Sequence, residues 1–182
     1  MLISQSAADM FAAEDLYPSD GGYRLNTTSI RASWLFFAGP GEVASFCKSH
    51  GVLKTSSPLP NGVRRGKARE CFKNAGELAL KYPTKFTYCE GWAQVPSCNR
   101  LTTAHAWCLD RKGNVVDPTW EYREGGEYLG LPVKTLALQE QICATEVWGF
   151  FPNGRRLPKG FFANPEAFIE SNFADGGLDE SF

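Results

Sequence analysis

Three residues of this chain carry the side chains of a thiol-based catalytic triad: Cys71, His105 and Asp117. They occur in that order, with 33 residues between the cysteine and the histidine and 11 between the histidine and the aspartate. A cysteine thiolate attacks an acyl carbon, an imidazole carries the proton, and a carboxylate orients the imidazole. The three residue types therefore predict acyl-transfer chemistry, if the fold brings them together.

The stretch between the histidine and the aspartate predicts a hairpin. Residues 105–110 are a strand candidate, residues 111–114 (Arg-Lys-Gly-Asn) are typical of a turn, and residues 115–116 (Val-Val) resume an extended chain. An Asp-Pro pair then ends the second arm. Two arms of similar length place His105 and Asp117 opposite each other, within reach of a hydrogen bond.

The segment 70–82 predicts a helix with the cysteine in its first turn. Its apolar residues recur at helical spacing, and Pro83 follows its end. Cys71 then lies in the first turn, where unpaired backbone N–H groups and the helix dipole favour a thiolate. Positive charge just before the helix acts in the same direction, and it comes from Arg64, Arg65, Lys67 and Arg69.

Further elements are predicted around these two. Residues 86–93 alternate as a strand does, and residues 128–133 predict another strand, at an edge because Pro132 cannot donate to a central ladder. Residues 135–144 and 165–172 predict helices. On the histidine strand, alternation puts the imidazole and Cys108 on opposite faces.

These motifs resemble the transglutaminase-like superfamily, which includes arylamine N-acetyltransferases, peptide N-glycanases and peptidase-like proteins of bacteria and viruses. Cys71 at a helix start, His105 and Trp107 in a His-x-Trp motif, and the Asp-Pro-Thr motif of residues 117–119 carry the resemblance. The order CFKNA, YCEGWA, HAW, DPTW and EYLG is also similar to short proteins of bacteria and phages, over residues 64–133. The resemblance implies a papain-like α+β fold, with the nucleophile helix packed on a small antiparallel sheet, and a Cys-His-Asp triad.

Five more residues are candidates for substrate binding. Trp107 shares a strand face with His105, so it either lines the acyl pocket or packs in the core. Glu90 is a second carboxylate near the site or a salt-bridge partner of the basic run. Gly91 allows close approach of backbone or substrate.

The other two candidates flank the cysteine. Asn74 shares a helical face with Cys71, and it either polarises the substrate or ties the helix to a loop, the second being favoured. Arg69 belongs to the basic run 64–69, which is either a solvated turn or a binding patch for an anionic substrate or partner.

Composition sets modest bounds on the class of protein. The chain has 182 residues, which suits a single domain with an N-terminal helical and loop region (1–63), a catalytic core (64–133) and a C-terminal extension (134–182). It carries 19 basic and 20 acidic residues, so the net charge of -1 argues against a globally basic nucleic-acid binder. Residues 5–16 predict a weak helix in the first region.

The six cysteines allow a disulfide framework, but free thiols are favoured. The N-terminus lacks the basic n-region of a signal peptide and no apolar run is long enough for a membrane span, so a cytoplasmic location is expected. The sequence has no C-x-x-C motif and only two histidines, so neither a metal nor another cofactor is predicted.

Acyl transfer is the predicted function, on a small-molecule, peptide or protein substrate. Hydrolysis results if water releases the acyl group, and transfer results if an amine does. The alternative is a non-catalytic binding protein that keeps the fold, for example a phage-encoded inhibitor that captures a host protein. A third reading is a phage-particle component with lytic activity.

Overall fold

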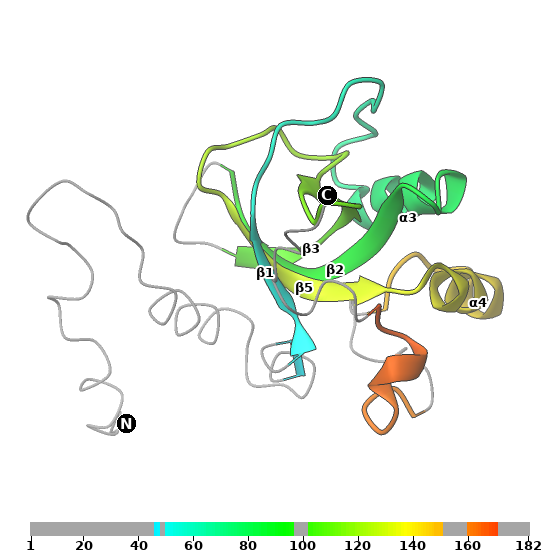
Figure 1. Ribbon diagram of the computed structural model, residues 1–182. Helices are drawn as coiled ribbons and strands as arrows, with labels where there is room; N and C mark the ends of the chain where they lie inside the picture. The colour runs from blue at the N-terminus through cyan, green and yellow to red at the C-terminus, as the bar shows by residue number, and fades with distance from the viewer. Residues whose placement is uncertain (1–45, 48–49, 97–101, 151–159, 171–182) are drawn as a thin grey trace, which may run out of the picture.

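The computed structural model describes residues 46–47, 50–96, 102–150 and 160–170. Their centre is one curled antiparallel sheet of five strands in the order β1-β5-β2-β3-β4 (Figure 1). The strands are β1 (Val52–Thr55), β2 (Phe86–Gln94), β3 (Thr102–Asp110), β4 (Val115–Val116) and β5 (Glu127–Val133). Together with the helices this confirms the α+β class. The predicted helix 5–16 lies outside the described residues.

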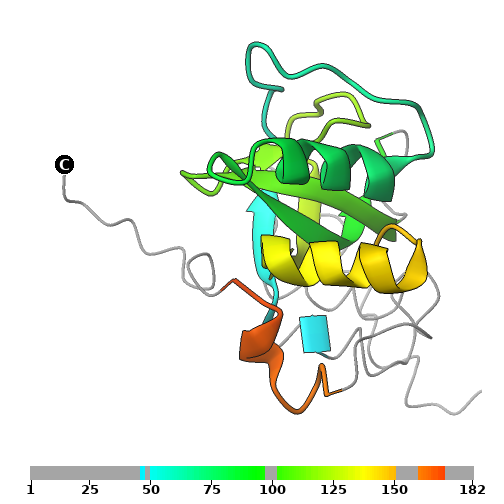
Figure 2. The same cartoon turned by 90° about the vertical axis from the view of Figure 1, so that its right-hand side faces the viewer.

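Two α-helices cover one face of the sheet. They are α3 (Cys71–Lys81) and α4 (Thr135–Thr145), and they lie side by side (Figure 2). Helix α3 packs on β3 through the small residues Ala75 and Ala79, so the helix approaches the strand closely enough for the thiol of Cys108 to donate to the carbonyl oxygen of Ala75 over 3.3 Å. This contact fixes the depth at which the first turn of α3 meets the sheet.

Strand alternation divides the core between the two faces of the sheet. We call the face under α3 and α4 the helix-covered face; its buried residues include Tyr88, Ala106, Cys108, Leu131 and Val133. The opposite face, the inner face, buries Cys89, Trp107, Leu109, Val115 and Tyr128. The predicted alternation of β2 and β3 is therefore confirmed, including the placement of Cys108 away from the imidazole.

Glycines draw β2 and β5 together where they pair. Gly91 stands opposite Gly130, and a Cβ atom on Gly91 would lie 2.2 Å from the carbonyl oxygen of Leu129. A Cβ atom on Gly130 would lie 2.5 Å from the ring of Trp107. The close approach expected at Gly91 is thus made by the backbone of β5. The absence of a side chain at Gly130 lets the Trp107 ring pack against β5.

Several element predictions need correction. Strand β3 begins at Thr102, earlier than predicted, and β1 was not predicted; it adds residues outside the segment 64–133 to the sheet. Strand β5 is internal, because it pairs with β1 on one side and with β2 on the other, although β1 pairs with it only as far as Gly130. The carbonyl oxygen of Pro132 accepts a hydrogen bond from the N–H of Glu170 over 2.9 Å, so it points away from β2. The nitrogen of the same residue points to the same side, so the missing N–H costs no hydrogen bond with β2.

The C-terminal helix predicted over 165–172 is shorter in the structure. A single 3₁₀ turn, η3 (Pro165–Ala167), occurs there, and residues 171–172 lie outside the described part of the chain. Across the described ranges, no helix combines the length and apolar composition that crossing a bilayer requires.

Candidate active site

Cys71 is the first residue of α3, as predicted, and its side chain is 9% exposed. Its sulfur accepts hydrogen bonds from the backbone N–H groups of Phe72 and Ala106. The N–H of Phe72 is free because it belongs to the first turn of a helix. The thiol is therefore surrounded by donors, as a thiolate requires.

The N–H of Ala106 is free because β4 is short. Asp110 donates its N–H across the hairpin to Asn114 over 3.0 Å, and alternate residues of a strand point the same way. Ala106 therefore also points toward the β4 edge, but β4 ends with Val116 opposite Cys108. Beyond the end of β4, the sulfur of Cys71 takes the place of a strand partner for the N–H of Ala106.

His105 links the sulfur to the carboxylate. Its Nε2 lies 2.8 Å from Oδ2 of Asp117, and its ring also forms a hydrogen bond with the thiol of Cys71. Because Nε2 is hydrogen-bonded to Asp117, the ring nitrogen that bonds the sulfur is the other one, Nδ1. The structure thus brings the three predicted catalytic side chains together in one hydrogen-bonded chain.

The hairpin joins the imidazole and carboxylate by a different register from the one predicted. Leu109 pairs with Val115 and Cys108 with Val116, so the next step of the ladder sets Asp117 against Trp107. His105 is the diagonal neighbour on the same strand face. The aspartate reaches it from beyond the end of β4.

Asp117 is held by its own turn and by β5. Its Oδ1 accepts the backbone N–H groups of Thr119 at 2.8 Å and Trp120 at 3.0 Å, and its Oδ2 accepts the hydroxyl of Tyr128 at 2.9 Å. The backbone N–H of Thr119 therefore helps to hold the carboxylate in place. These donors leave the carboxylate one orientation, toward His105.

The surroundings shift the pKa values of all three groups. Burial raises the pKa of Cys71, but the hydrogen bond and charge of His105 and two backbone N–H groups lower it below the usual value. Burial lowers the pKa of His105, but its bonds to Asp117 and Cys71 raise it to about 9. Burial raises the pKa of Asp117, while His105 and the turn lower it overall. All three shifts act in the direction of thiolate, imidazolium and carboxylate.

The other buried thiols lie in a different environment. Burial is the first cause that raises the pKa of Cys47, Cys89 and Cys108 above the usual value. All five described cysteines are free, which confirms the expectation for them, and Cys143 is exposed. The sixth, Cys98, lies outside the described residues.

Two of the candidate substrate-binding residues lie in the core. Trp107 is completely buried on the inner face, with its ring centroid 5.1 Å from that of Tyr128. Glu90 is completely buried on the helix-covered face, where it accepts the hydroxyl of Tyr88 at 2.9 Å and the N–H of Phe150 at 2.8 Å. Gly91, the third, pairs with His105 through the backbone.

Asn74 and Arg69 flank the nucleophile. The Asn74 amide donates to the carbonyl oxygen of Lys67 at 2.8 Å and to Oγ1 of Thr119 at 3.0 Å, so it ties α3 to two loops. Arg69 is exposed and has a left-handed backbone, with φ of 68°.

Two site residues were not predicted. The Trp120 ring stacks on His105, with centroids 3.7 Å apart and an angle of 11° between the planes, and Tyr128 donates to Asp117. Trp120 ends the DPTW motif, so the motif itself was the available signal. The contact of Tyr128 depends on long-range pairing of β5, which local sequence does not reveal.

Within the described ranges, no group of three or more His, Cys, Asp or Glu side chains is arranged to hold a metal ion. Comparisons of the chain with protein-family models, curated proteins and solved structures found no match. The case for a function therefore rests on the geometry around Cys71.

Proposed function

We propose that the protein is a thiol-dependent acyl-transfer enzyme, a hydrolase or an acyltransferase, with Cys71 as nucleophile and a transglutaminase-like arrangement of helix and sheet. The observation that carries the proposal is the hydrogen-bonded chain from the sulfur through His105 to Asp117. A buried cysteine with a structural role alone needs neither an imidazole nor a carboxylate behind it.

In the first half of the reaction, the Cys71 thiolate attacks the carbonyl carbon of an amide, ester or thioester. A C–S bond forms, and negative charge develops on the carbonyl oxygen. We assign the backbone N–H groups around the sulfur, those of Phe72 and Ala106, as donors to this oxyanion. The bond to the leaving group then breaks, and the His105 imidazolium gives it a proton.

In the second half, His105 is neutral and acts as a base. It removes a proton from water or from an amine, which attacks the thioester carbon and expels the Cys71 thiolate. Asp117 stays ionised throughout and stabilises the imidazolium each time it forms. The cycle returns the enzyme to its starting protonation state without a cofactor.

The test is the capture of an acyl-enzyme. Incubation with p-nitrophenyl acetate is expected to release one equivalent of nitrophenolate rapidly and to leave one acetyl group on Cys71, as located by peptide mass mapping. Cys71→Ala abolishes the burst, and His105→Ala slows it by roughly 10²–10⁴-fold. Cys143→Ala, which removes an exposed free thiol, is the matched control and keeps the burst.

Acetylation spread over several cysteines, or a burst that His105→Ala leaves intact, contradicts the proposal. Either result favours the reading of the protein as a binding protein that keeps the fold.

A further inference from the structure

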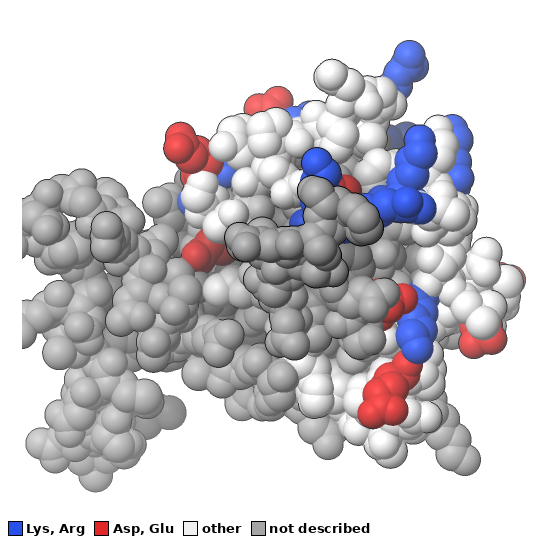
Figure 3. Space-filling model, viewed as in Figure 1, with Lys and Arg blue, Asp and Glu red and all other residues white. Residues whose placement is uncertain are grey.

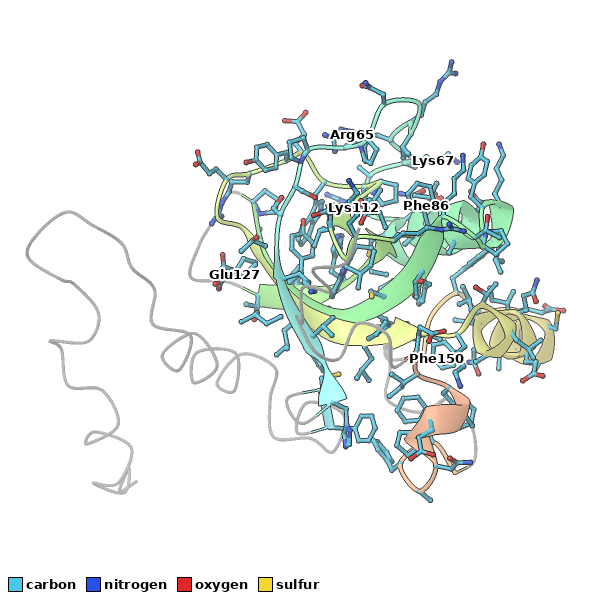
Figure 4. The ribbon with its side chains drawn as sticks, in the orientation of Figure 1. Arg65, Lys67, Phe86, Lys112, Glu127 and Phe150 are labelled. Atoms are coloured by element: carbon cyan, nitrogen blue, oxygen red, sulfur yellow. The ribbon has the colours of Figure 1, made fainter. Side chains whose placement is uncertain are left out.

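The residues just before the nucleophile concentrate positive charge. Four of the six residues from 64 to 69 are Lys or Arg, in a chain whose net charge is -1. All four side chains are exposed, and we call this stretch the basic segment. Lys and Arg side chains gather at the upper right of Figure 3, over α3 and the loop that leads into it. Figure 4 labels two of them, Arg65 and Lys67.

Hydrogen bonds join the basic segment to the turn after Asp117 and to α3, the helix that begins with Cys71. The N–H of Gly66 donates to the carbonyl oxygen of Pro118 over 2.8 Å, next to Asp117, and Arg65 donates to the carbonyl oxygen of Trp120. Asn74 of α3 donates to the carbonyl oxygen of Lys67. The segment therefore bridges the carboxylate turn and the helix start, with a fixed backbone.

Gly66 is required for this fit. A Cβ atom there would lie 2.1 Å from Oδ1 of Asn74, so a larger residue would displace the amide that ties α3 to Lys67 and Thr119. The backbone of the basic segment is therefore held against α3 by packing as well as by sequence proximity to Cys71.

Two of the four side chains make neither an ion pair nor a side-chain hydrogen bond with the described residues, and they stand seven and two positions before the nucleophile in the chain. Lys67 forms an ion pair with Glu70 at 3.8 Å, and Arg65 is bound to the Trp120 carbonyl. Arg64 and Arg69 form no ion pair with any other described residue. Arg69 also occupies a left-handed conformation, which glycine would adopt at lower cost, two residues before the nucleophile.

We propose that Arg64 and Arg69 bind a negatively charged oxygen group, a carboxylate or a phosphate, on the acyl donor that Cys71 attacks. Guanidinium groups are always charged and match the geometry of both anions. This inference rests on the proposed function, because the donor is defined by attack at Cys71. It assigns the substrate class as anionic acyl compounds.

The test compares two alkylating reagents of nearly equal size, anionic iodoacetate and neutral iodoacetamide. The quantity measured is the ratio of their rates at Cys71, followed by peptide mass mapping at low ionic strength. Arg69→Gln is expected to lower this ratio about twofold, and the double variant Arg64→Gln/Arg69→Gln about fourfold, because each charge acts across water-exposed distances of order 10 Å. Arg69→Lys keeps the charge and retains the ratio.

Lys112→Gln is the matched control. Lys112 is exposed on the turn between β3 and β4, seven residues along the chain from His105, and its removal leaves the ratio unchanged. A ratio that the double variant also leaves unchanged overturns the proposal. The imidazolium of His105 is common to every variant, so it cannot produce the expected difference.

A second measurement separates this inference from the proposed function. With thioesters of succinate and butyrate, the double variant is expected to lower the preference for the succinyl donor about fourfold. A fourfold fall in the alkylation ratio with no acylation by either thioester would contradict the proposed function and retain the anion site. Acylation with an unchanged preference would do the reverse.

Discussion

Two buried carboxylates in this molecule each accept a hydrogen bond from a tyrosine hydroxyl, but they have different roles. Tyr128 donates to Asp117 over 2.9 Å on the inner face, and Tyr88 donates to Glu90 over 2.9 Å on the helix-covered face. Each carboxylate also accepts backbone N–H groups, from its own turn at Asp117 and from Phe150 at Glu90. Hydrogen bonds of this kind satisfy a buried carboxylate.

The difference between the two lies in what else they contact. Asp117 accepts from His105, and through that ring its charge stabilises a proton beside the sulfur of Cys71. On the helix-covered face, burial and then the charge of Glu90 raise the pKa of the Cys47 thiol. A carboxylate therefore activates a thiol only through an intervening imidazole; directly, it suppresses the thiolate.

The largest expected effect separates the two carboxylates by acylation rate. Asp117→Asn removes the charge that stabilises the imidazolium, so the rate of acetylation of Cys71 is expected to fall by roughly 10²–10⁴-fold. Glu90→Gln keeps an oxygen acceptor on the other face and is expected to leave the rate within about threefold. The burst of nitrophenolate measures both. Equal losses in the two variants would mean that the faces are not functionally distinct.

The next effect separates them by stability. Glu90→Ala leaves the N–H of Phe150 and the hydroxyl of Tyr88 buried without this acceptor, and it is expected to lower the free energy of unfolding by about 2–4 kcal/mol. Urea denaturation gives the value. Glu77→Ala, at an exposed position of α3, is the control and stays within about 0.5 kcal/mol. An equally small change in the free energy of unfolding of Glu90→Ala would show that Glu90 does not stabilise the fold.

A third prediction uses pH. Because the pKa of Cys71 is lowered, its alkylation by iodoacetamide is expected to fall less between pH 8 and 6.5 than that of free N-acetylcysteine, which loses about twentyfold. Acylation by an amide or an alkyl ester is expected to decline as pH rises through about 9, since His105 then loses the proton that such a basic leaving group needs. Cys108, whose pKa is raised by burial, stays unlabelled throughout. A Cys71 profile parallel to that of the free thiol contradicts the lowered pKa of Cys71.

Local sequence signals account for the parts of the site that lie on single elements. The period of α3 placed Cys71 in its first turn, and the turn residues around Gly113, which has a φ of 77°, predicted the hairpin that carries His105. Alternation separated the imidazole from Cys108. Each of these depends on neighbours within a few residues in the chain.

Long-range pairing decided the rest. Glu90 was predicted near the site or in a salt bridge with the basic run, but it is buried on the helix-covered face, where the N–H of Phe150 reaches it from 60 residues away. Pro132 suggested an edge strand, yet β5 lies between β1 and β2, and it accommodates the proline because β1 stops short of it. Tyr128 reaches Asp117 only once β5 has paired with β1 and β2.

The smallest expected effect concerns Asn74, which connects the two faces: it belongs to α3 on the helix-covered side and binds Thr119 beside Asp117. Asn74→Ala is expected to lower the free energy of unfolding by about 1–2 kcal/mol, because its two bonds are largely buried. Lys73→Ala, at the exposed neighbouring position, is the control and stays within about 0.5 kcal/mol. A higher KM with unchanged stability would instead make Asn74 a substrate ligand, since a residue that only ties loops to α3 cannot alter binding without loosening the fold.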